Sequence, residues 1–366
     1  MSTLENTALP AGAALVPLTI PDTLDAQDAG DFVAMVHTRN EICREINGND
    51  DEDSTPAELL PVFGRSEYTQ RLWWIVRLDG EVVGRVGVEL PREDGSRVAI
   101  WWIELLRRVW GRGIGTGALA VVERTARDHG RTVLQAWAAH THGDGEQLAA
   151  PTGFGSVPED HAARFLLRHG YALEQIERQS YLPLDASTDR RIAALLAEAR
   201  AASADYGVVR WALPTPDEFI DGYAWLKSRM ATDAPAAGLE IDEEAWDADR
   251  VRDHDRRYVE SGRILHVTAA RHLETGTLVA FNELVASTDP ERATMQEDTL
   301  VLKEHRGHRL GMLVKCAGLQ AWREFAPLSP RVMTWNAEEN RPMLDINEAI
   351  GFIPQLYNGA WKKELR

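Results

Sequence analysis

The chain has 366 residues, of which 44% are hydrophobic and 27% charged, and its formal net charge is −17. This length is enough for two or three domains, each with a core of its own. The acidic balance argues against nucleic acid or an anionic membrane as partner, because both require a basic surface.

The N-terminal sequence and the cysteines predict a cytoplasmic protein. Residues 1–20 lack the basic region and apolar run of a signal peptide, and no apolar stretch reaches the ~20 residues of a membrane helix. Cys43 and Cys316 lie far apart and in no zinc-type spacing, which fits a reducing compartment. His140, His142 and His161 also lack a defined ligand spacing, so we predict no metal site.

In chain order, residues 72–90 predict a β-hairpin that turns at Asp79-Gly80, and residues 97–106 predict a further strand. The stretch "VWGRGIGTGAL" at 109–119 then places a glycine-rich turn before an apolar helix. A strand over 131–140 and a helical segment that closes at Gly170-Tyr171 follow. Residues 185–204 are rich in alanine and predict a helical linker.

The same order of elements returns after the linker. A hairpin over 264–284, a strand over 293–302, the turn and helix "HRGHRLGMLVK" at 305–315, and a strand over 331–337 lead to Gly351-Phe352. Three pairs of glycines are each 196 residues apart: Gly80 and Gly276, Gly111 and Gly307, and Gly115 and Gly311. The chain therefore reads as two copies of one α/β domain.

A turn of this kind is suited to an anion. Backbone N–H groups at a helix start point one way, the helix dipole adds positive potential, and glycines let a diphosphate approach closely. Neither turn matches the phosphate-loop motif GxxxxGK[ST], and "GRGIGTG" matches GxGxxG only loosely.

The segments "EHRGHRLG" and "NAEENRPMLDINEAIGF" resemble the GCN5-related N-acetyltransferase (GNAT) superfamily, whose coenzyme loop reads (Gln/Arg)-x-x-Gly-x-(Gly/Ala). The resemblance covers almost the whole chain and implies two tandem GNAT-fold domains of mixed α/β class, each a splayed sheet flanked by helices. Tandem members from actinobacteria, mycothiol synthase among them, are similar in plan. The expected division is a tail at 1–15, a degenerate domain at 16–184, the linker at 185–204 and a catalytic domain at 205–366.

The resemblance implies acetyl-coenzyme A as co-substrate, held at both turns. In the second copy the pyrophosphate loop would be Arg306, Gly307, His308, Arg309, Leu310 and Gly311, with Val301 and Leu302 lending backbone groups to the pantetheine. In the first copy the corresponding residues are Leu105, Gly111, Arg112, Gly113, Gly115 and Gly117. Asn336, Asn340 and Asn347 either support the structure or touch the coenzyme.

Acetyl transfer to an amine needs a base for the ammonium and an acid for the leaving thiolate. The second copy offers Glu297 and Asp298 on the strand before the turn, and Glu283 on the hairpin. The first copy has Trp101 and Trp102 there, with Glu104 three residues nearer the turn, so we expect chemistry in the second copy. Tyr357 either reaches the thiolate or is a packed surface aromatic.

These features predict direct transfer of acetyl to a primary amine of a small molecule or peptide by a monomer or homodimer, and the acidic composition is compatible with a cationic acceptor. Met230, Asp233 and Trp246 are the expected acceptor-binding residues. Two alternatives stay open: a non-catalytic acyl-coenzyme A sensor or scaffold, and acetylation of a cysteinyl amine as in mycothiol synthase.

Overall fold

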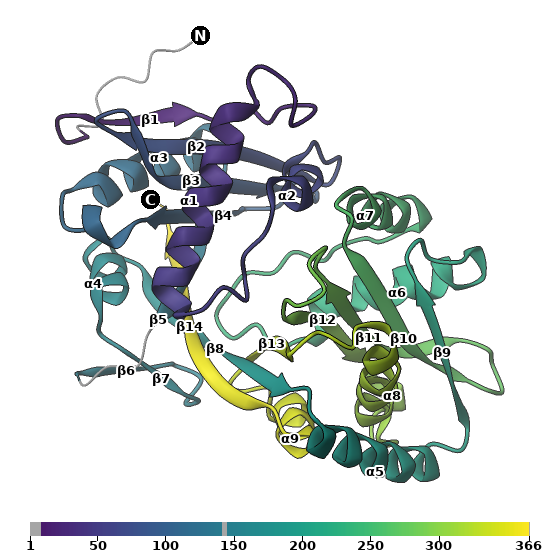
Figure 1. Cartoon of the computed structure of the whole chain (residues 1–366). Helices are drawn as coiled ribbons and strands as arrows, with labels where there is room; N and C mark the ends of the chain where they lie inside the picture. The colour runs from purple at the N-terminus through teal and green to yellow at the C-terminus, as the bar shows by residue number, and fades with distance from the viewer. Residues whose placement is uncertain (1–8, 141–144, 366) are drawn as a thin grey trace.

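The computed structural model describes residues 9–140 and 145–365, and its main feature is one sheet of 12 strands (Figure 1). The strand order is β1-β2-β3-β4-β5-β14-β8-β13-β12-β11-β10-β9, and a two-stranded ribbon, β6-β7, stands apart. We use "N-terminal half" for the residues up to the end of β8 and "C-terminal half" for the residues from α5 onward.

The N-terminal half alternates helices and strands in the order the sequence predicts. Its elements are β1 (Ala13–Pro17), α1 (Ala29–Asn47), α2 (Pro56–Phe63), β2 (Thr69–Leu78), β3 (Glu81–Pro91), β4 (Val98–Leu105), the 3₁₀ turn η1 (Arg107–Val109), α3 (Ile114–Asp128), β5 (Val133–His140), β6 (Gln147–Ala149), β7 (Ser156–Pro158), α4 (His161–Arg168) and β8 (Ala172–Pro183).

The C-terminal half repeats this order. Its elements are α5 (Ala186–Ala202), β9 (Tyr206–Ala212), α6 (Asp217–Asp233), α7 (Ala248–Glu260), β10 (Ile264–His272), β11 (Leu278–Ala286), β12 (Thr294–Val301), the 3₁₀ turn η2 (Lys303–His305), α8 (Leu310–Phe325), β13 (Arg331–Ala337), α9 (Arg341–Ile350) and β14 (Ile353–Glu364).

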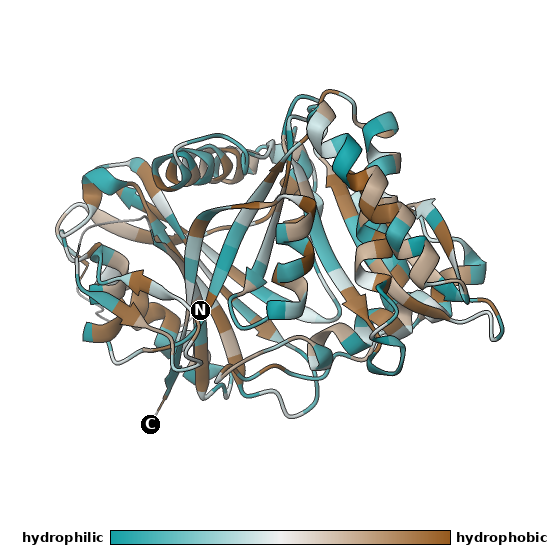
Figure 2. Cartoon of the chain, turned by 90° about the horizontal axis from the view of Figure 1, so that it is seen from below, coloured by the Kyte–Doolittle hydropathy of each residue, from teal (hydrophilic) through white to brown (hydrophobic). Residues whose placement is uncertain are grey.

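The two predicted hairpins are confirmed as β2–β3 and β10–β11, both antiparallel. Asp79 and Gly80 turn the first with φ of 51° and 89°, the left-handed pair that suits the twist of a two-residue hairpin. The predicted apolar face of α8, which includes Leu310, Leu313 and Val314, is buried against the sheet. Figure 2 shows the same segregation, with hydrophobic residues gathered on strands and on the helix faces turned toward them.

Helices cover both faces of the sheet. In the N-terminal half, α1 and α2 enclose one core cluster around Phe32 and Met35, while α3 encloses another on the opposite face. In the C-terminal half, α6 and α7 enclose a cluster around Tyr223 and Phe281, and α5, α8 and α9 enclose one around Trp322. The predicted linker helix, α5, is thus a packed element and lies against α8.

The two halves are joined by an exchange of strands. The last strand of the chain, β14, pairs with β5 and β8, while β8 pairs with β13 as well as with β14 (Figure 1). Each half therefore completes its part of the sheet with a strand of the other half. None of the helices in the described part of the chain is long and apolar enough to cross a bilayer.

The central strands splay apart in both halves, as the resemblance implied. β4 and β5 run parallel and pair only from Val98 to Ile100, and β12 and β13 pair only at Thr294 and Met295. Beyond these pairs the strands diverge toward the turns that follow β4 and β12. The splay opens the interior of the sheet at the place where a ligand is expected.

Candidate active site

The two turns have the same backbone conformation. Gly111 and Gly113 have φ of 73° and 84°, and their counterparts Gly307 and Arg309 have φ of 89° and 56°. Arg309 thus adopts the left-handed conformation despite its side chain, which costs an ordinary residue about 1–2 kcal/mol. In both turns a helix begins at the next residue, so its first N–H groups face outward from the turn.

A cavity of 760 Å³ opens beside the first turn, and we call it the N-terminal cavity. Gly111, Gly113 and Gly115 line one end, together with three cationic side chains: Arg107, Arg164 and Arg168. From there the cavity passes between β4 and β5 and reaches the end of α1 on the other face of the sheet. Its far wall includes Trp335, Leu356 and Asn358 of the C-terminal half.

Three carboxylates line this cavity: Asp160, which accepts from Ala163 N at the start of α4, and Glu52 and Glu104, whose environments differ. Burial pushes the pKa of Glu104 upward, but the charge and hydrogen bond of Arg85, 2.5 Å away, outweigh it and leave that pKa below its usual value. Burial raises the pKa of Glu52, although Arg39 and a hydrogen bond from Gln179 Nε2 to Glu52 Oε1 (2.9 Å) oppose the rise. Glu104 is therefore kept ionised, while Glu52 is the stronger base.

The rest of the cavity wall is aromatic and apolar. Trp110 stacks on His161 with ring centroids 4.4 Å apart, and its indole N–H donates to the carbonyl of Leu105 at 2.8 Å. Cys43 also lines the cavity, and burial raises the pKa of its thiol to about 12. A thiol with so high a pKa is a poor nucleophile near neutral pH.

The residues predicted as bases in the C-terminal half form a different arrangement. Glu297 and Asp298 of β12 together oppose the single residue Glu283 of β11, which makes a β-bulge. Glu283 is 1% exposed and accepts hydrogen bonds from Tyr223 and from Lys227 Nζ (3.3 Å). Its enclosure prevents a substrate from reaching it.

Lys227 also binds Asp298 at 2.5 Å, so this buried cluster largely neutralises itself. Burial lowers the pKa of Lys227, but the charges of Asp298 and Glu283 outweigh it and raise that pKa above its usual value. Glu297 is exposed to solvent; desolvation by the surrounding atoms and the charge of Asp298 raise the pKa of its carboxyl. Asp298 lines a second cavity, whereas Glu283 and Glu297 line neither that cavity nor the N-terminal cavity.

That cavity measures 310 Å³ and is bounded by both halves. Its wall includes two of the predicted acceptor residues, Met230 and Trp246, and also Trp137 of β5, which lines the N-terminal cavity as well. The third predicted acceptor residue, Asp233, is buried elsewhere, where it pairs with Lys303 (3.3 Å) and Arg306 (3.9 Å).

In the interior of the C-terminal half, polar side chains of α8, α9 and β13 bind one another. Lys315 of α8 is fully buried and donates to Asn347 Oδ1 at 2.7 Å, and Asn347 donates to Asn336 Oδ1 at 2.7 Å. By the repeat, Leu119 and Leu166 are the counterparts of Lys315 and Asn347. The predicted coenzyme residues Asn336 and Asn347 thus bind each other in this structure.

The remaining predicted residues of the second copy are engaged locally. Arg306 Nε donates to the carbonyl of Val301 (3.2 Å), Leu302 N donates to Val279 O (3.0 Å), and Arg309 pairs with Glu198 (3.0 Å). Asn340 stands at the N-cap of α9 without a side-chain cap bond. His308 is exposed near Tyr206, Leu310 and Gly311 are buried, and the methyl end of Ile346 covers Gly311.

Three further predicted residues lie outside the sites they were assigned to. Tyr357 is on β14, opposite Arg178 and His140, so β8 and β13 separate it from the strand that leads into the second turn. Arg112 is exposed and does not line the N-terminal cavity, and Gly117 packs under Leu9. The histidine His142 lies outside the described residues.

The sequence reasoning missed Glu52, Gln179 and Cys43, and it set Glu104 aside in favour of the C-terminal carboxylates. The only signal for Glu52 was the run of four acidic residues at 50–53, which nothing in the turn motif singles out. Within the described residues, no group of three or more His, Cys, Asp or Glu side chains is arranged to hold a metal.

Comparisons with known proteins agree with this geometry. Residues 37–148, which contain the first turn and much of the N-terminal cavity, match the acetyltransferase (GNAT) family model. The chain therefore contains a GNAT acetyltransferase domain, a family of the acyl-coenzyme A N-acyltransferase class.

Over nearly its whole length the chain is similar in structure to tandem GNAT proteins. A tandem GNAT protein from the clavulanic acid biosynthesis pathway is 26% identical, with a TM-score of 0.71 over 96% of this chain and 98% of that one. A GCN5-related N-acetyltransferase from Sphaerobacter thermophilus shares the fold at 15% identity, with a TM-score of 0.61 over 98% of both chains. A GCN5-related glucosamine N-acetyltransferase region of a fungal multi-domain β-N-acetylglucosaminidase shares it at 14% identity and a TM-score of 0.60, over 97% of this chain and 38% of that one. No curated protein sequence matches the chain.

Proposed function

We propose that the protein transfers acetyl from acetyl-coenzyme A directly to a primary amine, and that the coenzyme binds in the N-terminal cavity. This places the chemistry in the half that the sequence had suggested to be degenerate. The observation that carries the proposal is the continuity of this cavity from the glycine turn to Glu52 and Glu104. Its volume of 760 Å³ lies in the range of small-molecule sites, about 300–1,000 Å³.

The residues at the turn suit the phosphate end of the coenzyme. Backbone N–H groups at the start of α3 and the side chains of Arg107, Arg164 and Arg168 supply positive charge at one end of the cavity. In the C-terminal half, by contrast, Arg306 and Arg309 are paired with Asp233 and Glu198. This difference supports the first turn as the coenzyme loop.

The two carboxylates suit the acceptor end. Glu104, held ionised by Arg85, attracts the ammonium form of the amine. Glu52, whose pKa is raised by burial, takes one proton from the ammonium, and the amine nitrogen attacks the thioester carbonyl. The C–S bond then breaks, and the leaving thiolate takes the second proton of the nitrogen, which gives the amide and the coenzyme thiol. The high pKa of Cys43 argues against an acetyl-cysteine intermediate and so supports direct transfer.

A second location for the chemistry deserves a direct test because the β-bulge at Glu297 and Asp298 adjoins the 310 Å³ cavity. There, Asp298 would serve as the base and Met230 and Trp246 would bind the acceptor. The filled interior around Lys315 and Asn347 argues against room for a pantetheine arm in this half.

The experiment compares two matched substitutions, Gly115→Trp and Gly311→Trp, which occupy equivalent positions in the two turns. Calorimetric titration with acetyl-coenzyme A should give a stoichiometry near one for the wild type. Binding should be lost in Gly115→Trp and kept in Gly311→Trp, with circular dichroism as the control for folding. The reverse pattern would place the coenzyme in the C-terminal half, and a wild-type stoichiometry of two would mean that both turns bind it.

Release of the coenzyme thiol should then be followed with a panel of primary amines that includes monoamines, diamines, amino sugars and a cysteinyl amine. We expect one class of amine to be acetylated by the wild type and not by Glu52→Gln. Binding of acetyl-coenzyme A with no amine acetylated would favour the non-catalytic sensor. Selective acetylation of the cysteinyl amine would favour the activity of mycothiol synthase.

A further inference from the structure

The loop that carries Glu52 contains four consecutive carboxylates, Asp50 to Asp53, and connects α1 to α2. Like charges so close together repel one another, so the loop requires cations to keep one conformation. Asp51 and Asp53 are nevertheless buried, with 8% and 7% of their surface exposed. Buried carboxylates of this kind need partners, and the partners show what holds the loop.

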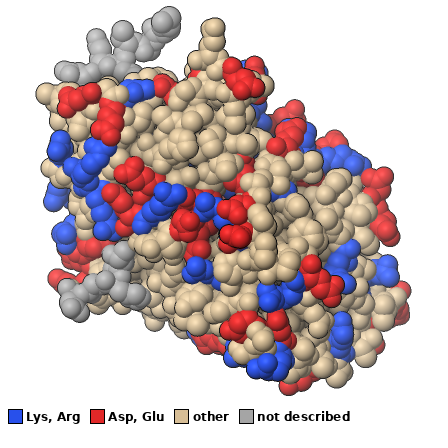
Figure 3. All heavy atoms as spheres, in the orientation of Figure 1, with Lys and Arg blue, Asp and Glu red and all other residues tan. Residues whose placement is uncertain are grey.

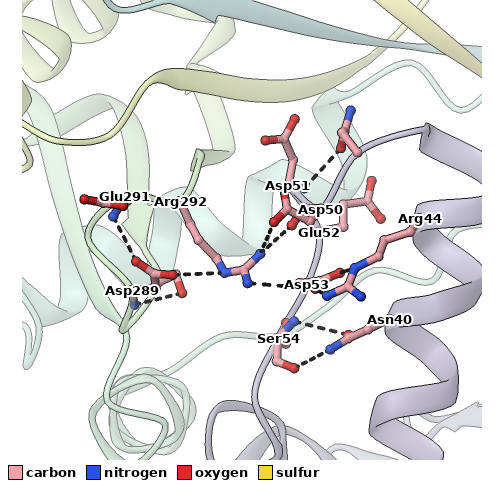
Figure 4. A network of polar contacts seen from close by, with 12 residues as sticks. Asn40, Arg44, Asp50, Asp51, Glu52, Asp53, Ser54, Asp289, Glu291 and Arg292 are labelled. Carbon is pink, nitrogen blue, oxygen red and sulfur yellow. Dashed lines mark hydrogen bonds and ion pairs between the residues drawn. The ribbon is translucent and has the colours of Figure 1, made fainter.

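The C-terminal half supplies the cations on one side of the loop (Figure 4). Arg292, between β11 and β12, donates from Nη1 to the carbonyl of Asp50 at 2.6 Å. Its guanidinium also lies 3.6 Å from the Asp50 carboxylate and 3.8 Å from that of Asp53. Arg331 of β13 adds a contact of 3.4 Å to Asp51.

Helix α1 holds the loop from the other side. Arg44 pairs with Asp53, and Asn40 Nδ2 donates to the carbonyl of Ser54 at 2.8 Å while Asn40 Oδ1 accepts from Ser54 N at 3.2 Å. Three of the four carboxylates thus face arginines. The fourth, Glu52, is turned to Gln179 and lines the N-terminal cavity.

We propose that Arg292 is a positioning residue for the N-terminal cavity: by clamping the acidic loop from the C-terminal half, it fixes where Glu52 stands. The inference rests on the proposed function, in which Glu52 takes the proton of the amine. The Arg292 guanidinium contacts a backbone carbonyl and two carboxylates of the loop. The backbone of Arg292 is itself held, because its carbonyl accepts a hydrogen bond from Ser329 Oγ at 3.0 Å. A displacement of about 1 Å at a reacting group lowers a rate by up to ~100-fold, so the clamp matters to catalysis without touching substrate.

Cys43 provides a readout that needs no acceptor. It lines the same cavity as Glu52, whereas the other cysteine, Cys316, is fully buried, so iodoacetamide reports on Cys43 in the native protein. When the loop loosens, water enters and the negative charge of Glu52 withdraws, and both changes favour the reactive thiolate. Alkylation of Cys43 should therefore be about tenfold faster in Arg292→Gln than in the wild type.

The matched control is Arg323→Gln. Arg323 also belongs to the C-terminal half, has the same 25% side-chain exposure as Arg292, and pairs with Asp189 away from the loop. In Arg323→Gln the alkylation rate of Cys43 should stay within twofold of the wild type. In Arg292→Lys that rate should fall between those of the wild type and Arg292→Gln. Equal rates in Arg292→Gln and Arg323→Gln would overturn the clamp. If Arg292→Gln does not fold, the comparison of Arg292→Lys with Arg323→Lys decides in the same way.

Turnover separates the inference from the proposed function. With the amine that the panel identifies, Arg292→Gln should lower kcat about tenfold and leave the KM for acetyl-coenzyme A unchanged. In a Glu52→Gln background the same substitution should lower kcat no further. Full activity of Glu52→Gln alone would refute the proposed base. An inactive Glu52→Gln with wild-type kcat in Arg292→Gln would refute only the clamp.

Discussion

Replacement of Lys315 by methionine is expected to stabilise the protein at neutral pH. The side chain is fully buried, and within the described residues its ammonium group makes a hydrogen bond to Asn347 but no ion pair. Burial lowers the pKa of Lys315 from its usual value of 10.5 to about 7. Methionine has nearly the same length and shape and carries no charge to desolvate.

The size of the effect follows from the pKa. Because the unfolded chain binds the proton up to higher pH than the folded chain, the group lowers the free energy of unfolding most at and below pH 7. There it costs about 4 kcal/mol, and the cost disappears as pH rises through 10.5. Loss of the hydrogen bond, with Asn347 left unpaired, costs the variant about 2 kcal/mol. The net gain of about 2 kcal/mol corresponds to roughly 2–3 °C in melting temperature for a chain of this length.

Urea denaturation of the wild type and Lys315→Met at pH 7, 9 and 10 checks the reasoning. The advantage of the variant should be nearly gone by pH 9 and reversed at pH 10, because the cost of deprotonating the lysine on folding then falls below the ~2 kcal/mol of the lost hydrogen bond. Leu119→Met, the counterpart substitution in the N-terminal half, should show no such pH dependence. A variant that is less stable at every pH would refute the argument, and one that is more stable but inactive would make Lys315 part of a working site.

Three further predictions concern other parts of the molecule. Burial pushes the pKa of Glu58 upward, but hydrogen bonds from Thr288 and its neighbours outweigh it and lower that pKa to about 2. The lowered pKa adds about 3 kcal/mol to the free energy of unfolding above the usual glutamate pKa, and this contribution is lost as pH falls toward 2. Glu58→Gln should therefore be less stable than the wild type above the usual glutamate pKa and equally stable near pH 2, as measured by acid denaturation. Gly113→Arg should cost only about 1 kcal/mol in thermal denaturation, because Arg309 adopts the same conformation, whereas Gly113→Val should cost more; equal losses would contradict this. The acidic limb of kcat/KM should lie above the usual glutamate pKa, since burial raises that of Glu52, and a limb at or below it would exclude Glu52 as the base.

The features that were predictable from the sequence are local ones. Hairpins, the glycine turns and the apolar face of α8 depend on residues a few positions apart, and the 196-residue offset made each copy a check on the other. The pairing of β14 with β5 is different, because strand partners distant in sequence are chosen by the packing of the whole sheet. Nothing in either copy alone indicates that the last strand belongs beside the first half.

The sequence also gives little basis for choosing between the two halves as the site of chemistry, for a related reason. Carboxylates at 283, 297 and 298 were favoured because they stand next to a turn, but Tyr223 and Lys227, which enclose Glu283, come from α6. Lys315 is fully buried in the C-terminal half. Its sequence alone predicts an exposed position on the helix, because lysine is almost never fully buried. Burial and partners, which decide the chemistry of a carboxylate, are set by tertiary contacts.

The distribution of charged side chains on the surface also depends on the tertiary structure. On the face drawn in Figure 3, acidic and basic side chains of the described residues are interspersed, so a net charge of −17 does not describe any one site. Several arginines form ion pairs with particular carboxylates: Arg85 with Glu104, Arg292 with Asp50 of the acidic loop, and Arg309 with Glu198.

Duplication in this chain has a structural consequence that two independent enzymes would not share. The N-terminal cavity takes part of its wall from Trp335, Leu356 and Asn358, and the loop behind it is held by Arg292. β14 also lies between β5 and β8 in the sheet. Removal of the C-terminal half would therefore remove this strand, part of the cavity wall and the arginine that binds the acidic loop. If the coenzyme binds in the N-terminal cavity, as proposed, the C-terminal half is required for that site, because residues of both halves form the cavity wall.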